Sequence, residues 1–172
     1  SAPEMTIAAS VSGVSPIKLN GPLVAGGDAR IGTISPDNST FVFTADAEID
    51  GVTELYSVPI GGGTVTKLNP DLSGSRDVNR FEISPDSSTV IFIADVGTTG
   101  KDEVYSVPIG GGTATKLNDP VTTNGRSIDF SLSPDGNTVV YIGDQDTDEI
   151  TELYSVPVGG GTVTKLSPNT LT

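Results

Sequence analysis

The sequence of 172 residues contains no cysteine, no histidine and no tryptophan. It therefore offers no Ser-His or Cys-His nucleophile pair, no thiolate or imidazole metal ligand, and no disulfide. Positive charge is also scarce, with 9 Lys and Arg against 22 Asp and Glu, and the net charge is −13. This balance argues against binding to nucleic acid or to an anionic membrane surface, because both depend on basic side chains.

Long hydrophobic runs are missing too. No apolar segment approaches the roughly 20 residues that a membrane-spanning helix needs. Residues 1–14 lack the basic start and apolar core that are typical of a signal peptide.

What the sequence does have is a repeat of 49 residues. Four lysines keep this interval through the chain, and three prolines and three tyrosines keep it through three copies: Lys18, Lys67, Lys116 and Lys165; Pro36, Pro85 and Pro134; Tyr56, Tyr105 and Tyr154. Residues 53–70 and 151–168 differ at only two positions, where Ile60 and Asn69 become Val158 and Ser167. A repeat of this length predicts stacked units, each of which needs a neighbour to bury its apolar face.

Each unit reads as four short antiparallel strands. In residues 77–118, a Ser-Pro-Asp turn separates a mixed segment ending at Ile83 from the run 89–94, which is apolar on both faces. A third strand, 103–109, leads through three glycines into the fourth, 113–117. The glycine runs are expected to form hairpin turns with positive φ, because no strand-to-helix context supports a phosphate-binding loop.

The fold class that we predict is all-β, with β-propeller blades of four antiparallel strands and 3.5 repeats per chain. The order Ser-Pro-Asp-x-x-Thr, apolar strand, Asp-rich loop, Glu-Leu-Tyr-x-Val, glycine turn and Thr-Lys-Leu resembles the TolB-type (PD40-like) β-propeller repeat, over 35–68, 84–117 and 133–166. The resemblance implies a propeller and weakly favours a periplasmic or extracellular location. It is not specific for function, since the family includes scaffolds, partner-binding modules and gating domains of enzymes.

The alignment of Lys18 with Lys67 predicts where the units begin and end. Residues 1–20 correspond to the third and fourth strands of a blade, followed by blades at 21–69, 70–118 and 119–172, the last including a C-terminal tail. Because 3.5 units leave a blade face uncovered, we expect a homo-oligomer, most simply a dimer that closes a ring. Two-fold symmetry permits six blades with the half-units displaced or swapped, or eight positions of which two are half-filled.

Two acidic loops are candidate calcium sites. Carboxylates alternate at the first, third and fifth positions and recur at the ninth, a spacing that can surround a hard cation with oxygen. The candidate ligands are Asp46, Glu48, Asp50 and Glu54 in the first copy, and Asp144, Asp146, Asp148 and Glu152 in the third. The middle copy has lost the third and fifth positions, and solvated hairpin loops remain the alternative interpretation.

The first strands of the units, which would line the channel of a propeller, differ most between copies. Charged residues there could bind a small polar or anionic ligand at the channel mouth: Arg30, Arg76, Asp77, Arg80, Arg126 and Asp129. The alternative is sequence drift in surface loops. Carboxylates on these strands are few, chiefly Glu82 and Asp129, so we expect no catalytic residues and no enzyme activity.

We therefore expect a non-enzymatic β-propeller scaffold that assembles into a closed ring, with calcium as its only candidate cofactor. The alternatives are a module that binds a ligand, peptide or partner at the channel mouth, and the propeller part of a larger hydrolase.

Overall fold

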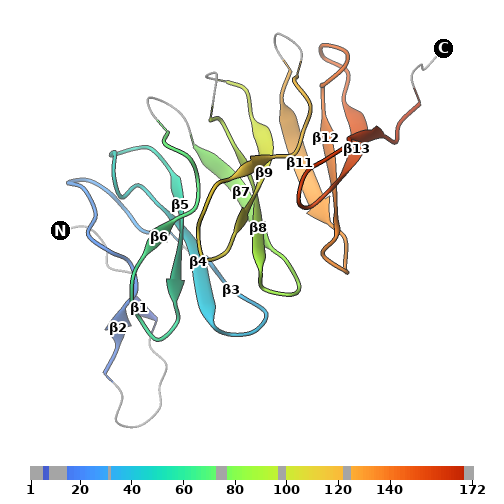
Figure 1. Cartoon of the computed structure of the whole chain (residues 1–172). Coiled ribbons are helices and arrows are strands. Elements are labelled where there is room, and N and C mark those ends of the chain that lie inside the picture. Colours follow the sequence, from blue (N-terminus) through green and yellow to red (C-terminus); the bar gives the residue numbers. More distant parts are fainter. Residues whose placement is uncertain are drawn as a thin grey trace.

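The computed structural model describes residues 6–7, 15–30, 32–72, 77–96, 100–121 and 125–168. All regular structure in these ranges is β, and no helix in them could cross a membrane. Three antiparallel four-stranded sheets stand side by side in chain order, and the first and the last of them lie at opposite ends of the row (Figure 1). The all-β propeller-blade architecture predicted from the repeat is thereby confirmed.

The three sheets are called blades 1, 2 and 3 below. Blade 1 contains β3 (Thr33–Ile34), β4 (Thr40–Ala45), β5 (Glu54–Pro59) and β6 (Thr66–Lys67). Blade 2 contains β7 (Val78–Ile83), β8 (Thr89–Ala94), β9 (Glu103–Pro108) and β10 (Thr115–Lys116). Blade 3 contains β11 (Ser127–Leu132), β12 (Thr138–Gly143), β13 (Glu152–Pro157) and β14 (Thr164–Lys165). The strands of each blade pair in chain order, so each blade is a meander.

The N-terminal half-unit forms a separate pair of strands, β1 (Thr6–Ile7) and β2 (Ile17–Lys18). They pair antiparallel with Thr6 opposite Lys18, which parallels the pairing of Tyr56 with Lys67 in blade 1. The half-unit therefore repeats the outer hairpin of a blade, without the inner two strands.

The Ser-Pro-Asp motif closes the first hairpin of every blade by the same hydrogen bonds. In blade 1, the Ser35 hydroxyl donates to Asp37 at 2.6 Å and accepts the Thr40 amide at 3.0 Å. The residue after the aspartate has positive φ in all three copies, at Asn38, Ser87 and Gly136. The aspartate accepts local donors that a chain reversal would otherwise leave unpaired, which explains why Ser and Asp recur together.

The glycine runs form the second hairpin turns, as predicted. The second and third glycines of each run have positive φ, for example 86° at Gly62 and 140° at Gly63. Any other residue type would be strained in this conformation.

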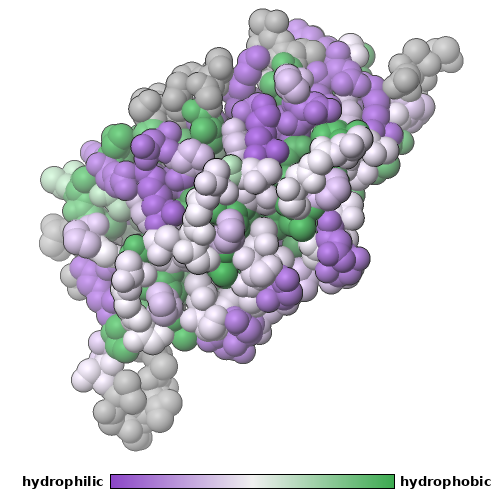
Figure 2. Space-filling model, in the orientation of Figure 1, coloured by the Kyte–Doolittle hydropathy of each residue, from purple (hydrophilic) through white to green (hydrophobic). Residues whose placement is uncertain are grey.

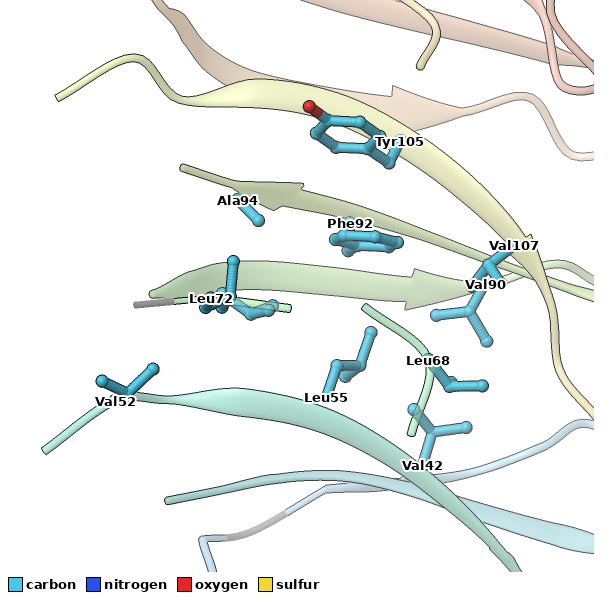
Figure 3. Packing of buried hydrophobic residues seen from close by; sticks show 11 residues of the cluster. Val42, Val52, Leu55, Leu68, Leu72, Val90, Phe92, Ala94, Tyr105 and Val107 are labelled. Atoms are coloured by element: carbon cyan, nitrogen blue, oxygen red, sulfur yellow. The ribbon is translucent and has the colours of Figure 1, made fainter. Parts of the chain in front are cut away.

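Each blade has two apolar faces, named here by direction along the chain. The front face points toward the next blade, and the back face points toward the preceding one. Between blades 1 and 2, front-face residues Val42, Leu55 and Leu68 meet back-face residues Val90 and Phe92, and all five are buried (Figure 3). Between blades 2 and 3, the front face of Ile91, Ile93, Val104 and Leu117 meets the back face of Val139, Tyr141, Tyr154 and Val156. The main cores therefore lie between sheets.

The back face of blade 1 is covered by the half-unit. Leu19 is 3% exposed and packs with Phe41, Phe43 and Tyr56 in a third apolar cluster. Leu19 stands where Leu68 stands in blade 1, so the half-unit supplies the same front-face leucine that a complete blade would supply.

Candidate functional site

A triad of Glu, Tyr and Lys with a buried tyrosine occurs in every blade. In blade 1, Glu54 is fully buried, accepts a hydrogen bond from the Tyr56 hydroxyl at 2.7 Å, and lies 2.8 Å from Lys67 Nζ. The same contacts recur among Glu103, Tyr105 and Lys116, and among Glu152, Tyr154 and Lys165. Sequence reasoning used these residues only to define the repeat. Their invariance across the copies was the signal for a shared structural role.

In blade 1 the triad holds Glu54 in the ionised form. Burial raises the pKa of Glu54, but the Lys67 ammonium, the Tyr56 hydroxyl and the Glu48 amide outweigh burial, so that the net shift is downward. Burial acts in the opposite direction on Lys67 and lowers its pKa. The carboxylates of Glu48 and Glu54 outweigh this effect, so that the net shift of the Lys67 pKa is upward. The pair is therefore charged at neutral pH and joins β5 to β6.

The candidate calcium ligands divide between this triad and the backbone. Glu48 forms an ion pair with Lys67 at 2.7 Å, and Asp146 forms the equivalent pair with Lys165 at 3.1 Å. Asp46 accepts the amides of Asp28 and Gly51, and Asp144 accepts the amide of Arg126 at 2.5 Å. Asp50 and Asp148 are exposed.

Lys67 and Lys165 thus lie between carboxylates that the spacing assigned to calcium. No three acidic side chains in the described ranges are placed to hold a metal ion. In blade 2 the loop has lost the matching carboxylates, and within the described ranges Lys116 forms an ion pair only with Glu103, at 2.6 Å. Calcium binding stays a prediction, and a bound ion would have to compete with the lysine in each loop.

A polar cavity of about 520 Å³ lies between the inner strands of blades 1 and 2. It brings together three of the predicted ligand-binding residues, Arg30, Asp77 and Arg80. Arg76 lies outside the described residues. Arg126 and Asp129 are not part of this cavity.

Most of these charged groups already have protein partners. Asp77 accepts the Thr53 amide at 2.6 Å and so connects blades 2 and 1. Arg80 pairs with Asp129, and its guanidinium lies 4.8 Å from the centre of the Phe130 ring, which connects blades 2 and 3. In contrast, the Arg30 guanidinium forms no ion pair with any residue that the structure describes, and its charge only stabilises the Asp46 carboxylate from a longer distance.

The front face of blade 3 is an exposed apolar surface, defined by Val140, Ile142, Ile150, Leu153 and Leu166. Ile150 is 53% exposed, Leu166 is 49% exposed, and Leu153 is 36% exposed. A mainly apolar hollow of about 200 Å³ is lined by Val140, Ile142 and Leu153, with Phe130 and Tyr141. Hydrophobic side chains also reach the surface in the view of Figure 2, among more polar ones. In the described part of the chain, nothing covers this face.

Comparison with solved structures identifies the fold as that of TolB-like β-propellers. TolB from Agrobacterium tumefaciens matches with a TM-score of 0.55 and 22% identity over 91% of this chain and 53% of that one. An oligogalacturonate lyase from Vibrio parahaemolyticus matches with a TM-score of 0.59 and 13% identity, covering 95% of this chain and 46% of that one. A structure from a study of two prolyl endopeptidases matches with a TM-score of 0.60 and 13% identity, covering 81% and 22%. Neither a protein-family model nor a curated protein sequence matches the chain.

The resemblance to the TolB-type repeat is confirmed at the level of the fold. The chain spans about half of the Agrobacterium TolB and less of the endopeptidase.

The comparison corrects one expectation. We expected no enzyme activity because the inner strands carry few carboxylates, but proteins of this fold include a lyase and peptidases. The scarcity of inner-strand carboxylates therefore does not mark a chain of this fold as non-enzymatic, and this chain covers only 22% of the endopeptidase and 24% of the peptidase.

Proposed function

We propose that this chain is a β-propeller interaction module that associates with a second copy of itself through the front face of blade 3. The observation that carries the proposal is the exposure of Leu153 and Leu166 on a face whose counterparts in blades 1 and 2 are fully covered. A contiguous apolar surface of this kind is typical of an association site.

The two interfaces inside the chain indicate what fits this face. Each joins a front face of aliphatic side chains to a back face that carries a stacked aromatic pair. In blade 2 the pair is Phe92 and Tyr105, with ring centres 5.4 Å apart, and in blade 3 it is Tyr141 and Tyr154, at 5.2 Å. Blade 1 carries the equivalent pair, Phe43 and Tyr56. A second copy therefore contains a surface of the required chemistry.

In that second copy, the half-unit lies over the required surface, since Leu19 packs on Phe43 and Tyr56. Two arrangements follow. Either the partner's half-unit itself docks on blade 3, which gives eight positions with two half-filled, or the half-unit is displaced and six blades close the ring.

The molar mass in solution tests the proposal. Light scattering at micromolar concentration should give twice the chain mass, and Leu153→Glu or Leu166→Glu should restore the monomer, because a charge would be buried without a partner. Ile49→Glu is the matched control, since Ile49 is 43% exposed but lies outside the front face of blade 3. A folded monomer at these concentrations, or equal loss of dimer in the control, would contradict the proposal.

A second candidate is that the chain is the propeller part of a larger hydrolase. It is favoured by the likeness to the endopeptidase structure, of which this chain covers 22%. Finding a hydrolase domain in the parent open reading frame would support it, and under this alternative a following blade would cover the front face of blade 3. The likeness to TolB supports the periplasmic or extracellular location expected above.

A further inference from the structure

The cavity between blades 1 and 2 lies where the first repeat departs from the other two. Phe81 in blade 2 and Phe130 in blade 3 have Gly32 as their counterpart in blade 1. A Cβ at Gly32 would lie 2.0 Å from the Val42 carbonyl oxygen, so the backbone conformation there leaves no room for a side chain. The regular part of the inner strand, β3, has two residues in blade 1, against six for β7 and β11.

Gly32 adds no side chain to the cavity, and Phe81 of blade 2 lines it from the other side. The cavity of about 520 Å³ falls in the size range of small-molecule sites. The cavity depends on blades 1 and 2 of one chain, so it is independent of the proposed self-association.

The groups around the cavity define the chemistry of a ligand. Arg30 contributes an exposed guanidinium that forms no ion pair in the described ranges, although its charge stabilises the Asp46 carboxylate. Guanidinium groups bind carboxylates through two parallel hydrogen bonds. Thr33, Thr44 and Thr53 add hydroxyl groups, which can donate to or accept from hydroxyl groups of a ligand.

The second arginine of the cavity does not compete for this role. Arg80 is paired with Asp129 and lies 3.8 Å from Glu82, so its charge is already balanced. The Asp77 carboxylate on the same wall would repel a ligand with several negative charges. The arrangement therefore favours one carboxylate over a dianion such as phosphate.

We propose that this cavity binds a small hydroxylated monocarboxylate, with its carboxylate on Arg30 and its hydroxyl groups on the threonines.

Calorimetric titration of the whole chain with gluconate tests the proposal. Sorbitol is the neutral comparison because it has the same number of carbons and hydroxyl groups in place of the carboxylate. We expect gluconate to bind at least about tenfold more tightly than sorbitol and than inorganic phosphate at matched ionic strength. Arg30→Gln should weaken gluconate binding by about tenfold or more, since it removes the charge-assisted hydrogen bonds.

Arg126→Gln is the matched control, because Arg126 is an exposed arginine of blade 3 outside the cavity. It should leave gluconate binding unchanged. Circular dichroism melts of both variants identify any loss of folding, and chemical shifts of the blade 1 threonines provide a second readout of binding. No heat and no shift with gluconate, equal binding of phosphate, or equal effects of the two substitutions would overturn the proposal.

Discussion

The front faces of blades 2 and 3 have nearly the same composition but different surroundings. Leu117 on blade 2 is 2% exposed, and Leu166, one repeat later, is 49% exposed. Val104 and Leu153 differ in the same way, at 0% and 36%. The strand pairing is unchanged between the two blades, so the exposure reflects only what lies against the face. A blade of this repeat can therefore keep its sheet without a neighbour on its front face, while the burial of that face depends on one.

The strongest test of this comparison is the same substitution on both faces. Leu117→Ala should lower the free energy of unfolding by about 2–5 kcal/mol, because it leaves a cavity in a closed core. Leu166→Ala should change it by less than about 0.5 kcal/mol at concentrations where the chain is monomeric. Urea denaturation of both variants measures the difference. Equal losses would mean that Leu166 is also covered in solution.

Removing residues 1–20 should make the N-terminal end resemble the C-terminal one. The deletion exposes Phe43 and Tyr56 by taking away Leu19, whose burial alone stabilises the fold by roughly 1.5–3 kcal/mol. It also distinguishes the two dimer arrangements by light scattering. Loss of the dimer would favour docking by the half-unit, and a tighter dimer would favour the six-blade ring. An unchanged unfolding free energy would contradict the covering role of Leu19.

Much of this architecture follows from sequence periodicity, and the reasons are local. The turn at Pro36 and the glycines at 62 and 63 have backbone requirements that few other residues meet, so their meaning does not depend on distant contacts. The Glu54–Lys67 pair was not predicted because the two residues lie on neighbouring strands, and the acidic spacing suggested a metal instead.

The site residues were harder to predict because pairing across blades decides their role. The repeat aligns Arg30 with Asn79 and Arg80 with Ile31. It therefore gives no sign that Arg80 pairs with Asp129 on the following blade, whereas the charge of Arg30 acts on Asp46 within its own blade. The repeat shows that Gly32 replaces the phenylalanine of the other two copies, but only the structure shows that Gly32 lines a cavity between blades 1 and 2.

Acid should weaken the Glu-Tyr-Lys triad of blade 1, whose two faces are covered, and that of blade 3, whose front face is exposed. In Glu54 and Glu152, burial raises the pKa but the neighbouring lysine and tyrosine lower it further, so the folded pKa lies below the unfolded one. Their stabilisation is therefore complete above the unfolded pKa and is lost as the pH falls through the folded pKa. Glu54→Gln should cost roughly 1.5–3 kcal/mol at pH 7, and the cost should shrink as the pH falls below about 4.

Glu152→Gln should cost less than Glu54→Gln, because Glu152 is 7% exposed and Glu54 is fully buried. Urea denaturation from pH 7 to pH 3 gives both profiles. A cost for Glu54→Gln that does not change with pH would contradict an ionised triad, and equal costs for the two variants would contradict the effect of burial.

The smallest expected effect is that of calcium on the two acidic loops. For exposed loops with a dissociation constant on the order of 10⁻³ M, 2 mM calcium would stabilise each site by about 0.6 kcal/mol relative to EDTA. This corresponds to a rise in Tm of about 1–3 °C.

Lys67 competes for the carboxylates of Glu48 and Glu54, so Lys67→Gln should enlarge the calcium response although it lowers the Tm itself. Lys116→Gln is the matched control, since its loop has lost two of the carboxylates. Melting curves at matched ionic strength, with magnesium for comparison, measure these differences. Superimposable curves in calcium and EDTA for both the natural chain and Lys67→Gln would mean that the loops bind only their lysines.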